Sequence, residues 1–203
     1  MYERNLNLDI KNVSYFRLFY SLIGIIYVWS LPLLSELGFS EKNSTSISQF
    51  ISNPQATGAM SAISFIPLTL MWEYQDLYLN IFKSNISNKY VIEYSLSLFQ
   101  IFYSLFLIFS VSYAPMWLHT TVVIMFCISF IIHSIYINHF ISINLITKII
   151  LIIGCISFFC LLFAKGMWFW VCECIGFSSM ILFTPIDWYF LSKNDNFIAL
   201  QEI

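Results

Sequence analysis

Apolar runs of about twenty residues recur along the chain, and short polar connections separate them. A helix of about 20 mostly apolar residues is long enough to cross the hydrocarbon core of a bilayer. A helix also pairs its own backbone amides and carbonyls, which find no water in that core. The runs are about twice as long as a membrane-spanning β-strand and lack its alternation of apolar and polar residues. The sequence therefore predicts an all-α, polytopic transmembrane helical bundle.

We expect one transmembrane domain over residues 1–203, with six spans. The first apolar run is longer than the apolar core of a typical signal peptide, and we interpret it as a retained span. Charged residues make up only 10% of the chain and hydrophobic residues 59%, whereas a soluble domain carries roughly 25% charged residues. The predicted spans are about 15–35, 57–77, 90–113, 117–138, 146–164 and 167–190, with a polar loop at 36–56 and a polar hairpin at 80–89.

The positively charged residues predict the orientation of the bundle, because lysine and arginine are enriched in cytoplasmic loops. With a cytoplasmic N-terminus, seven of these residues lie inside and two outside, which puts both termini in the cytoplasm. The tripeptide Asn43-Ser44-Thr45 then lies on the lumenal or extracellular side, where Asn43 is a glycosylation candidate. The inner set is Arg4, Lys11, Arg17, Lys83, Lys89, Lys148 and Lys193; the outer set is Lys42 and Lys165.

The composition also limits partners and cofactors. A net charge of −2 without a basic cluster excludes nucleic acid as a partner. Membrane lipids are the expected partners, and other membrane proteins are a second class. No histidine, cysteine, aspartate or glutamate cluster has the spacing of a metal site, and three histidines are too few for a pair of haems. We therefore expect no metal and no cofactor, and we interpret the five cysteines as unpaired thiols.

Two ionisable residues lie at the outer ends of predicted spans, where a charge needs a partner. Glu173 lies six residues into the last span, or about 9 Å below its outer boundary. His119 begins the fourth span, and Thr120 and Ser178 add hydroxyls nearby. One interpretation is an outer-leaflet pocket that meets a lipid head group. The other is an interhelical hydrogen bond that only orients the bundle.

The remaining polar and small residues of the spans favour structural roles. The carboxylates near the inner ends can reach cytoplasmic water or pair with lysines. Gln100 lies in the middle of the third span, where an interhelical hydrogen bond is the expected role. The glycines inside the spans are expected at close helix contacts. These carboxylates are Glu73, Asp76, Glu93 and Asp187, and these glycines are Gly24, Gly154 and Gly176.

Four features of the chain resemble a known six-span superfamily. The first is the six-span layout with cytoplasmic termini, and the second is the Ile-Ser…Pro pattern of the loop Ser46–Pro54. The third is the histidine that opens the fourth span in Trp117–Thr121. The fourth is the last span, which begins Cys172–Phe177 and ends in Asp187-Trp188. The superfamily groups the DRAM autophagy modulators, the Sfk-type plasma-membrane proteins and the Golgi post-GPI-attachment factor. The resemblance implies a lipid-linked role in the plasma membrane or in an endomembrane such as the Golgi, the ER or the lysosome.

Three functions stay open on the sequence. The first, implied by the resemblance, is a non-catalytic protein that serves GPI-anchor lipid remodelling, phospholipid organisation, or autophagy and lysosome regulation. The second is a small channel or transporter. The third is a membrane-embedded acyltransferase or hydrolase in which His119 and Glu173 are candidate catalytic residues, acting as base and orienting group.

Overall fold

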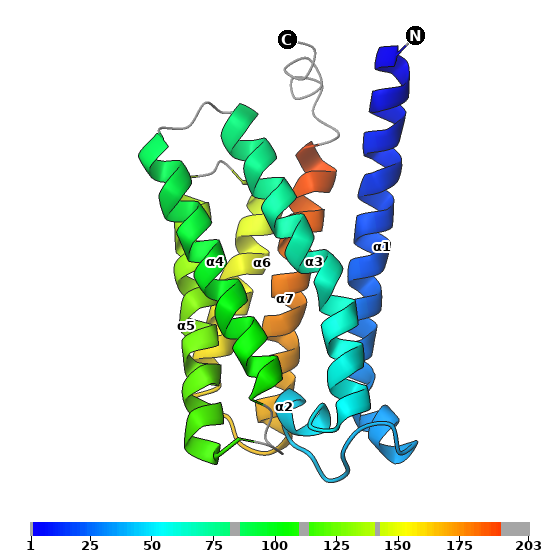
Figure 1. Cartoon of the computed structure of the whole chain (residues 1–203), viewed down its shortest axis with the longest axis vertical. Coiled ribbons are helices and arrows are strands. Elements are labelled where there is room, and N and C mark those ends of the chain that lie inside the picture. Colours follow the sequence, from blue (N-terminus) through cyan, green and yellow to red (C-terminus); the bar gives the residue numbers. More distant parts are fainter. Residues whose placement is uncertain (1, 82–85, 110–113, 141–142, 192–203) are drawn as a thin grey trace.

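Within the residues that the structure describes, every regular element is an α-helix. The structure is a computed structural model that describes residues 2–81, 86–109, 114–140 and 143–191. Figure 1 shows long helices that run up and down one axis in alternating directions, so that α1 begins and α7 ends at the same end of the bundle. The helices are α1 (Tyr2–Glu36), α2 (Ile47–Phe50), α3 (Pro54–Ile81), α4 (Ile86–Ile108), α5 (Met116–Phe140), α6 (Leu145–Cys160) and α7 (Met167–Leu191).

Four helical segments in the described ranges are long and apolar enough to cross a membrane. They are Tyr15–Glu36, Tyr90–Ile108, Met116–His139 and Met167–Phe190, and α6 is a shorter apolar helix of 16 residues. These segments coincide with the first, third, fourth and sixth predicted spans. The chain is therefore an all-helical protein with the multi-pass character expected of an integral membrane protein.

Several predicted boundaries differ from the helices. α1 begins at Tyr2 and continues through polar residues into its apolar part, and α3 and α4 extend into the predicted hairpin at 80–89. The fifth predicted span ends at 164, but α6 ends at Cys160, whose carbonyl accepts hydrogen bonds from the amides of Phe163 and Ala164. Residues 110–113 of the third predicted span lie outside the described residues. The predicted boundaries differ because hydropathy follows the apolar residues, whereas a helix ends where its backbone hydrogen bonding ends.

The predicted polar loop at 36–56 contains a short helix, α2, that was not expected from the sequence. Ser46 caps it, and the Ser46 hydroxyl accepts a hydrogen bond from the amide of Gln49 at 3.2 Å. Ile47, Phe50 and Ile51 follow at helical spacing and are all buried. A serine followed three residues later by glutamine, with an apolar face between, is a signature of a helix start. This part of the chain therefore folds back onto the bundle.

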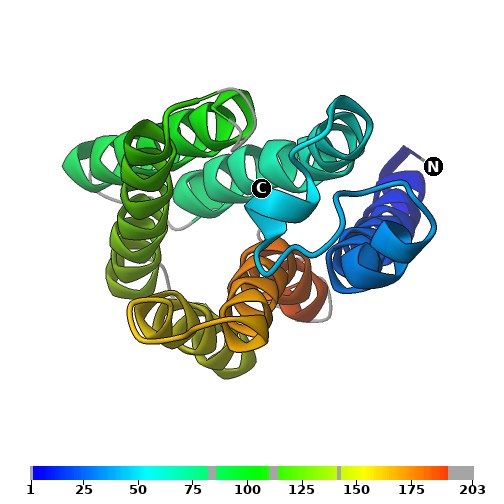
Figure 2. The ribbon, with the colours of Figure 1, turned by 90° about the horizontal axis from the view of Figure 1, so that it is seen from below.

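The helices surround a common core in which the contacts are unequal. Figure 2, seen from the end that carries α2, shows a curved wall running from α3 through α4, α5 and α6 to α7. α1 packs against α7 and, over a smaller surface, against α3. The pairs α4–α5 and α6–α7 make extensive contacts, whereas α5 and α6 touch over a much smaller surface. The seam between α5 and α6, like that between α3 and α4, is therefore much less closely packed than the α4–α5 and α6–α7 pairs.

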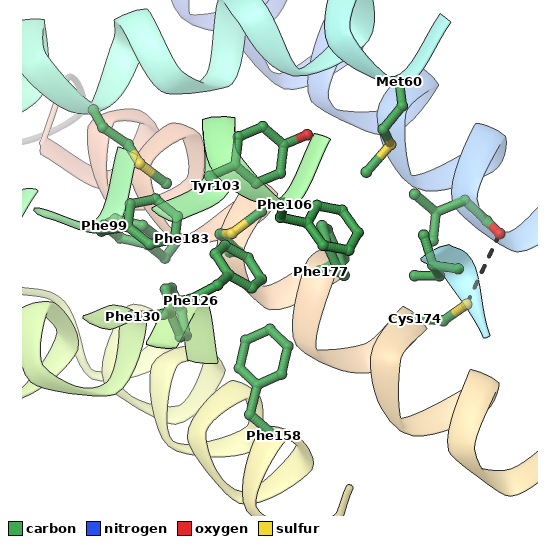
Figure 3. Packing of buried hydrophobic residues seen from close by; sticks show 14 of the residues in the cluster. Met60, Phe99, Tyr103, Phe106, Phe126, Phe130, Phe158, Cys174, Phe177 and Phe183 are labelled. Carbon is green, nitrogen blue, oxygen red and sulfur yellow. Dashed lines mark hydrogen bonds between the residues drawn. The ribbon is translucent and has the colours of Figure 1, made fainter. Parts of the chain in front are cut away.

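Aromatic rings fill the centre of the core (Figure 3). The Phe126 ring lies 5.6 Å from the rings of Phe99 and Phe177 and 5.8 Å from that of Phe106. Phe158 of α6 meets Phe130 at 5.4 Å. Offset and edge-on ring pairs at these separations are favourable beyond the area that they bury. The rings therefore join α4, α5, α6 and α7 into one packed unit.

Two glycines allow α6 and α7 to approach closely, as the sequence predicted. A Cβ at Gly154 would lie 2.7 Å from the Cβ of Ser179, and one at Gly176 would lie 2.6 Å from the Phe158 ring. Gly24 has a similar but looser environment, with Ile63 3.1 Å from the added Cβ.

Gln100 has its expected interhelical role. Its side-chain oxygen accepts a hydrogen bond from the Trp72 ring nitrogen, and its side-chain nitrogen donates to the carbonyl of Leu68 at 3.0 Å.

Gly154→Ala is expected to destabilise the protein. The added methyl overlaps Ser179, and overpacking of this kind costs about 1–3 kcal/mol. That cost exceeds the ~0.5–1 kcal/mol by which a helix prefers alanine to glycine. Thermal unfolding of the detergent-purified protein should show a lower Tm. The control is Gly58→Ala, where nothing lies within 4 Å of the added methyl and the Tm should hold or rise. A Gly154→Ala variant that melts at or above the wild type contradicts this packing.

Candidate functional site

A cavity of about 670 Å³ lies along the seam between α5 and α6, beneath α2 and the first turns of α7. Its polar end is formed by side chains from three parts of the chain, and its remainder is an apolar slot. The polar lining residues are Thr45, Ser46, Ser48, Gln49, His119, Thr120, Lys165 and Glu173. The apolar lining is chiefly Met116, Val123, Ile124, Ile128, Ile131, Phe158, Phe159, Leu161, Leu162 and Phe169.

The length of the slot matches one leaflet of a bilayer. His119 and Ile131 both line it and are twelve residues apart, which is ~18 Å along a helix. Half of the ~30 Å hydrocarbon core of a bilayer is ~15 Å. A slot of this length with polar groups at one end is complementary in length and polarity to one acyl chain with a polar head group.

The cavity opens sideways, at the outer surface of the bundle. Ile124, Ile128 and Phe159 line it and are still 47%, 44% and 59% exposed. Their apolar side chains flank the entrance from α5 on one side and α6 on the other. The smaller contact surface of this helix pair leaves the room for such an opening.

Glu173 connects α7 to α2 at the polar end of the cavity. Its side chain is only 4% exposed, and its Oε2 accepts a hydrogen bond from the Ile47 amide at 2.5 Å. Ile47 is the first residue of α2. The first amides of a helix have no acceptor within the helix and carry partial positive charge. A carboxylate supplies the missing acceptor and the opposite charge. Glu173 therefore attaches the start of α2 to α7.

His119 has a fixed orientation and lines the same end of the cavity. It is 5% exposed, and its Nδ1 lies 2.7 Å from the carbonyl oxygen of Phe109. A carbonyl only accepts, so Nδ1 carries the proton and donates it. In the neutral ring Nε2 then keeps a lone pair. The side chains of His119 and Glu173 make no hydrogen bond or ion pair with each other among the described contacts.

The structure brings together three of the four residues predicted for the polar pocket. His119, Thr120 and Glu173 line one cavity. Ser178 lies instead against α1, where its hydroxyl accepts a hydrogen bond from the Trp29 ring nitrogen at 3.0 Å. Asn43, the glycosylation candidate, is exposed, with a positive φ of 59°, in the connection before α2.

The connection before α3 and the α6–α7 turn also contribute to the cavity, which the sequence did not predict. Gln49 and Lys165 both line the polar end. The pattern Ser46-x-x-Gln49 was a usable signal for a helix start. No comparable signal marks Lys165, because a single lysine in a turn is equally compatible with a solvated side chain.

Asp187, expected to reach cytoplasmic water or pair with a lysine, is not solvated. It has no exposed surface, and its Oδ1 accepts from the Asn144 amide at 2.7 Å and from the Thr147 hydroxyl at 2.9 Å. Both partners belong to the start of α6. α7 therefore carries two buried carboxylates, and each binds the beginning of another helix.

Comparisons of the chain with models of known protein families, with curated proteins and with solved structures found no match. The resemblance to the six-span superfamily therefore stays a prediction that depends on the motifs alone.

Removal of the acceptor at position 173 should loosen α2. In Glu173→Leu the Ile47 amide loses its partner, a loss that costs about 1–3 kcal/mol for a buried donor. Amide hydrogen exchange of residues 47–51 should then accelerate by about tenfold or more. The matched control is Glu173→Gln, whose side-chain oxygen still accepts from Ile47 and should keep exchange near the wild-type rate. Equal exchange rates in the wild type and the leucine variant would show that this hydrogen bond does not hold α2.

Proposed function

We propose that this chain is a six-span, non-catalytic membrane protein that binds a membrane lipid in the cavity between α5 and α6. The acyl chain would occupy the apolar slot, and the head group would meet the polar end beneath α2. The observation that carries the proposal is the cavity itself, an apolar slot that is open at the outer surface of the bundle and has its polar lining residues gathered at one end. An acyl chain with a polar head group fits this combination of features.

The polarity of the slot indicates which part of a lipid confers selectivity. Lipid tails are as apolar as leucine side chains, so an acyl chain that moves from the bilayer into the slot gains little from the hydrophobic effect. Polar interactions at the head group must then discriminate one lipid from another. The polar end provides hydroxyl, amide, imidazole, ammonium and carboxyl groups for this purpose.

The proposed topology adds α3 and α6 to the four apolar segments and places both termini in the cytoplasm. Two observations support it. α1 begins and α7 ends at the same end of the bundle (Figure 1). Trp117 and Trp168, at the opposite end, are 70% and 73% exposed, as expected for rings in a membrane interface. In this orientation the polar end of the cavity lies in the outer or lumenal leaflet.

The biological role that we propose follows the superfamily resemblance. It comprises GPI-anchor lipid remodelling, phospholipid organisation, or control of autophagy and lysosomes, in an endomembrane or the plasma membrane. A channel is less well supported because aromatic rings fill the centre of the described bundle. An acyltransferase or hydrolase is the second candidate, because Nδ1 of His119 is anchored and the ring lines the cavity. It ranks lower because His119 and Glu173 each bind a backbone group rather than each other.

The orientation can be tested at Lys42, an exposed residue in the connection before α2. In sealed membrane vesicles with the lumenal face inside, a Lys42→Cys variant should resist a membrane-impermeant maleimide until detergent is added. The wild type, with its own five cysteines, gives the background labelling. Immediate labelling of the intact vesicles would place this end of the bundle on the cytoplasmic side and overturn the topology.

Lipid binding can be tested by filling the slot. Ile128 lines the cavity, and Ile135 lies two helical turns further along α5, outside the cavity and 58% exposed. We expect Ile128→Trp to reduce the lipid that remains bound through purification by about tenfold, since the indole occupies the position of the acyl chain. Ile135→Trp should retain the wild-type amount. Native mass spectrometry measures the bound lipid, and equal retention by the two variants would contradict the proposal.

A further inference from the structure

At the polar end of the cavity, some side chains already make hydrogen bonds within the protein, and others have donors left for a ligand. The hydroxyl of Ser46 accepts from the Gln49 amide and shares a hydrogen bond of 3.1 Å with the hydroxyl of Ser48. The Thr45 hydroxyl donates to Gln49 Oε1 at 3.3 Å. These three hydroxyls therefore stabilise the start of α2 and are not the main groups left for a ligand.

The side-chain amide of Gln49 presents donors to the cavity. Its Oε1 accepts from the Thr45 amide at 2.8 Å. A backbone N–H only donates, so this contact fixes which end of the side-chain amide is oxygen. The Nε2 group, with two hydrogens, makes no hydrogen bond among the described contacts and belongs to a residue that lines the cavity. Gln49 is therefore oriented to donate to a ligand oxygen.

Lys165 supplies an accessible positive charge at the polar end of the cavity. It is exposed, lines the cavity, and makes no ion pair within the described structure. The acidic residue of the cavity lining, Glu173, is 4% exposed and accepts a hydrogen bond from the Ile47 amide. The same bond occupies the first amide of α2, and the Ser46 hydroxyl occupies the amide of Gln49.

Together these groups select the charge of the head group. We propose that the lipid bound in the α5–α6 cavity is anionic, with a head-group oxygen paired to the Lys165 ammonium and a second one accepting from Gln49 Nε2. The proposal deepens the proposed function and depends on it. Charge-assisted hydrogen bonds are about twice as strong as neutral ones, so the Lys165 contact is the larger source of selectivity.

The test compares lipids that differ only in the head group. The full-length protein, stripped of lipid in detergent, is titrated with phosphatidylglycerol and with phosphatidylcholine of identical acyl chains, and native mass spectrometry measures occupancy. We expect the wild type to bind phosphatidylglycerol about tenfold more tightly or more, as charge-assisted hydrogen bonds imply. Lys165→Gln should abolish this preference, and Lys165→Arg should keep it.

Two controls make the result specific. Lys42→Gln removes a lysine from the same end of the molecule that does not line the cavity, and it should leave the preference unchanged. Inorganic phosphate alone, added in excess, should not displace phosphatidylglycerol. Displacement by phosphate would indicate a soluble-anion site and overturn the lipid assignment.

The possible failures are distinguishable. If the wild type binds both lipids equally, or if Lys165→Gln keeps the preference, the inference about charge is wrong while the acyl-chain site stands. If neither lipid binds, and Ile128→Trp behaves like Ile135→Trp, the proposed function itself is wrong.

Discussion

The hydrogen bond between the Ile47 amide and the Glu173 carboxyl group is the contact on which the candidate site depends. It joins α2 to α7 across 126 positions of sequence. Without it, the connection that carries Thr45, Ser46, Ser48 and Gln49 would have no polar attachment to α7 in the described structure. The same bond stabilises a carboxyl group that is buried within the bundle, because the start of a helix supplies an unpaired donor.

α7 uses this arrangement twice. Glu173 binds the start of α2, and Asp187, fourteen residues further along, binds the start of α6. The two sites are ~21 Å apart along the helix axis, close to opposite ends of the bundle. Between them, Gly176 allows close contact with Phe158, and α7 packs against α1, α3 and α6. α7 is therefore joined directly to α1, α2, α3 and α6, and the cavity opens on the side where α5 and α6 have fewer contacts.

Features that depend on one segment could be predicted, and features that depend on two segments mostly could not. The need of Glu173 for a partner, the close contacts at Gly154 and Gly176, and the interhelical role of Gln100 could each be predicted from the position of one residue in one apolar helix. The partner of Glu173 did not follow, since α2 was predicted as loop. Ser178 illustrates the same limit, because its position on α7 alone does not show that it faces Trp29.

The sequence by itself determined that the chain is helical, where most of its long helices run, and which residues are too polar to face lipid unpaired. These properties are local, because each helix satisfies its own backbone and hydropathy is a property of a single run. Only the tertiary structure decided which helices touch, that α2 covers one end, and that Lys165 and His119 line one cavity. Apolar helix surfaces are chemically alike in lipid, so shape and a few polar contacts select the neighbours, and those contacts join residues far apart in the chain.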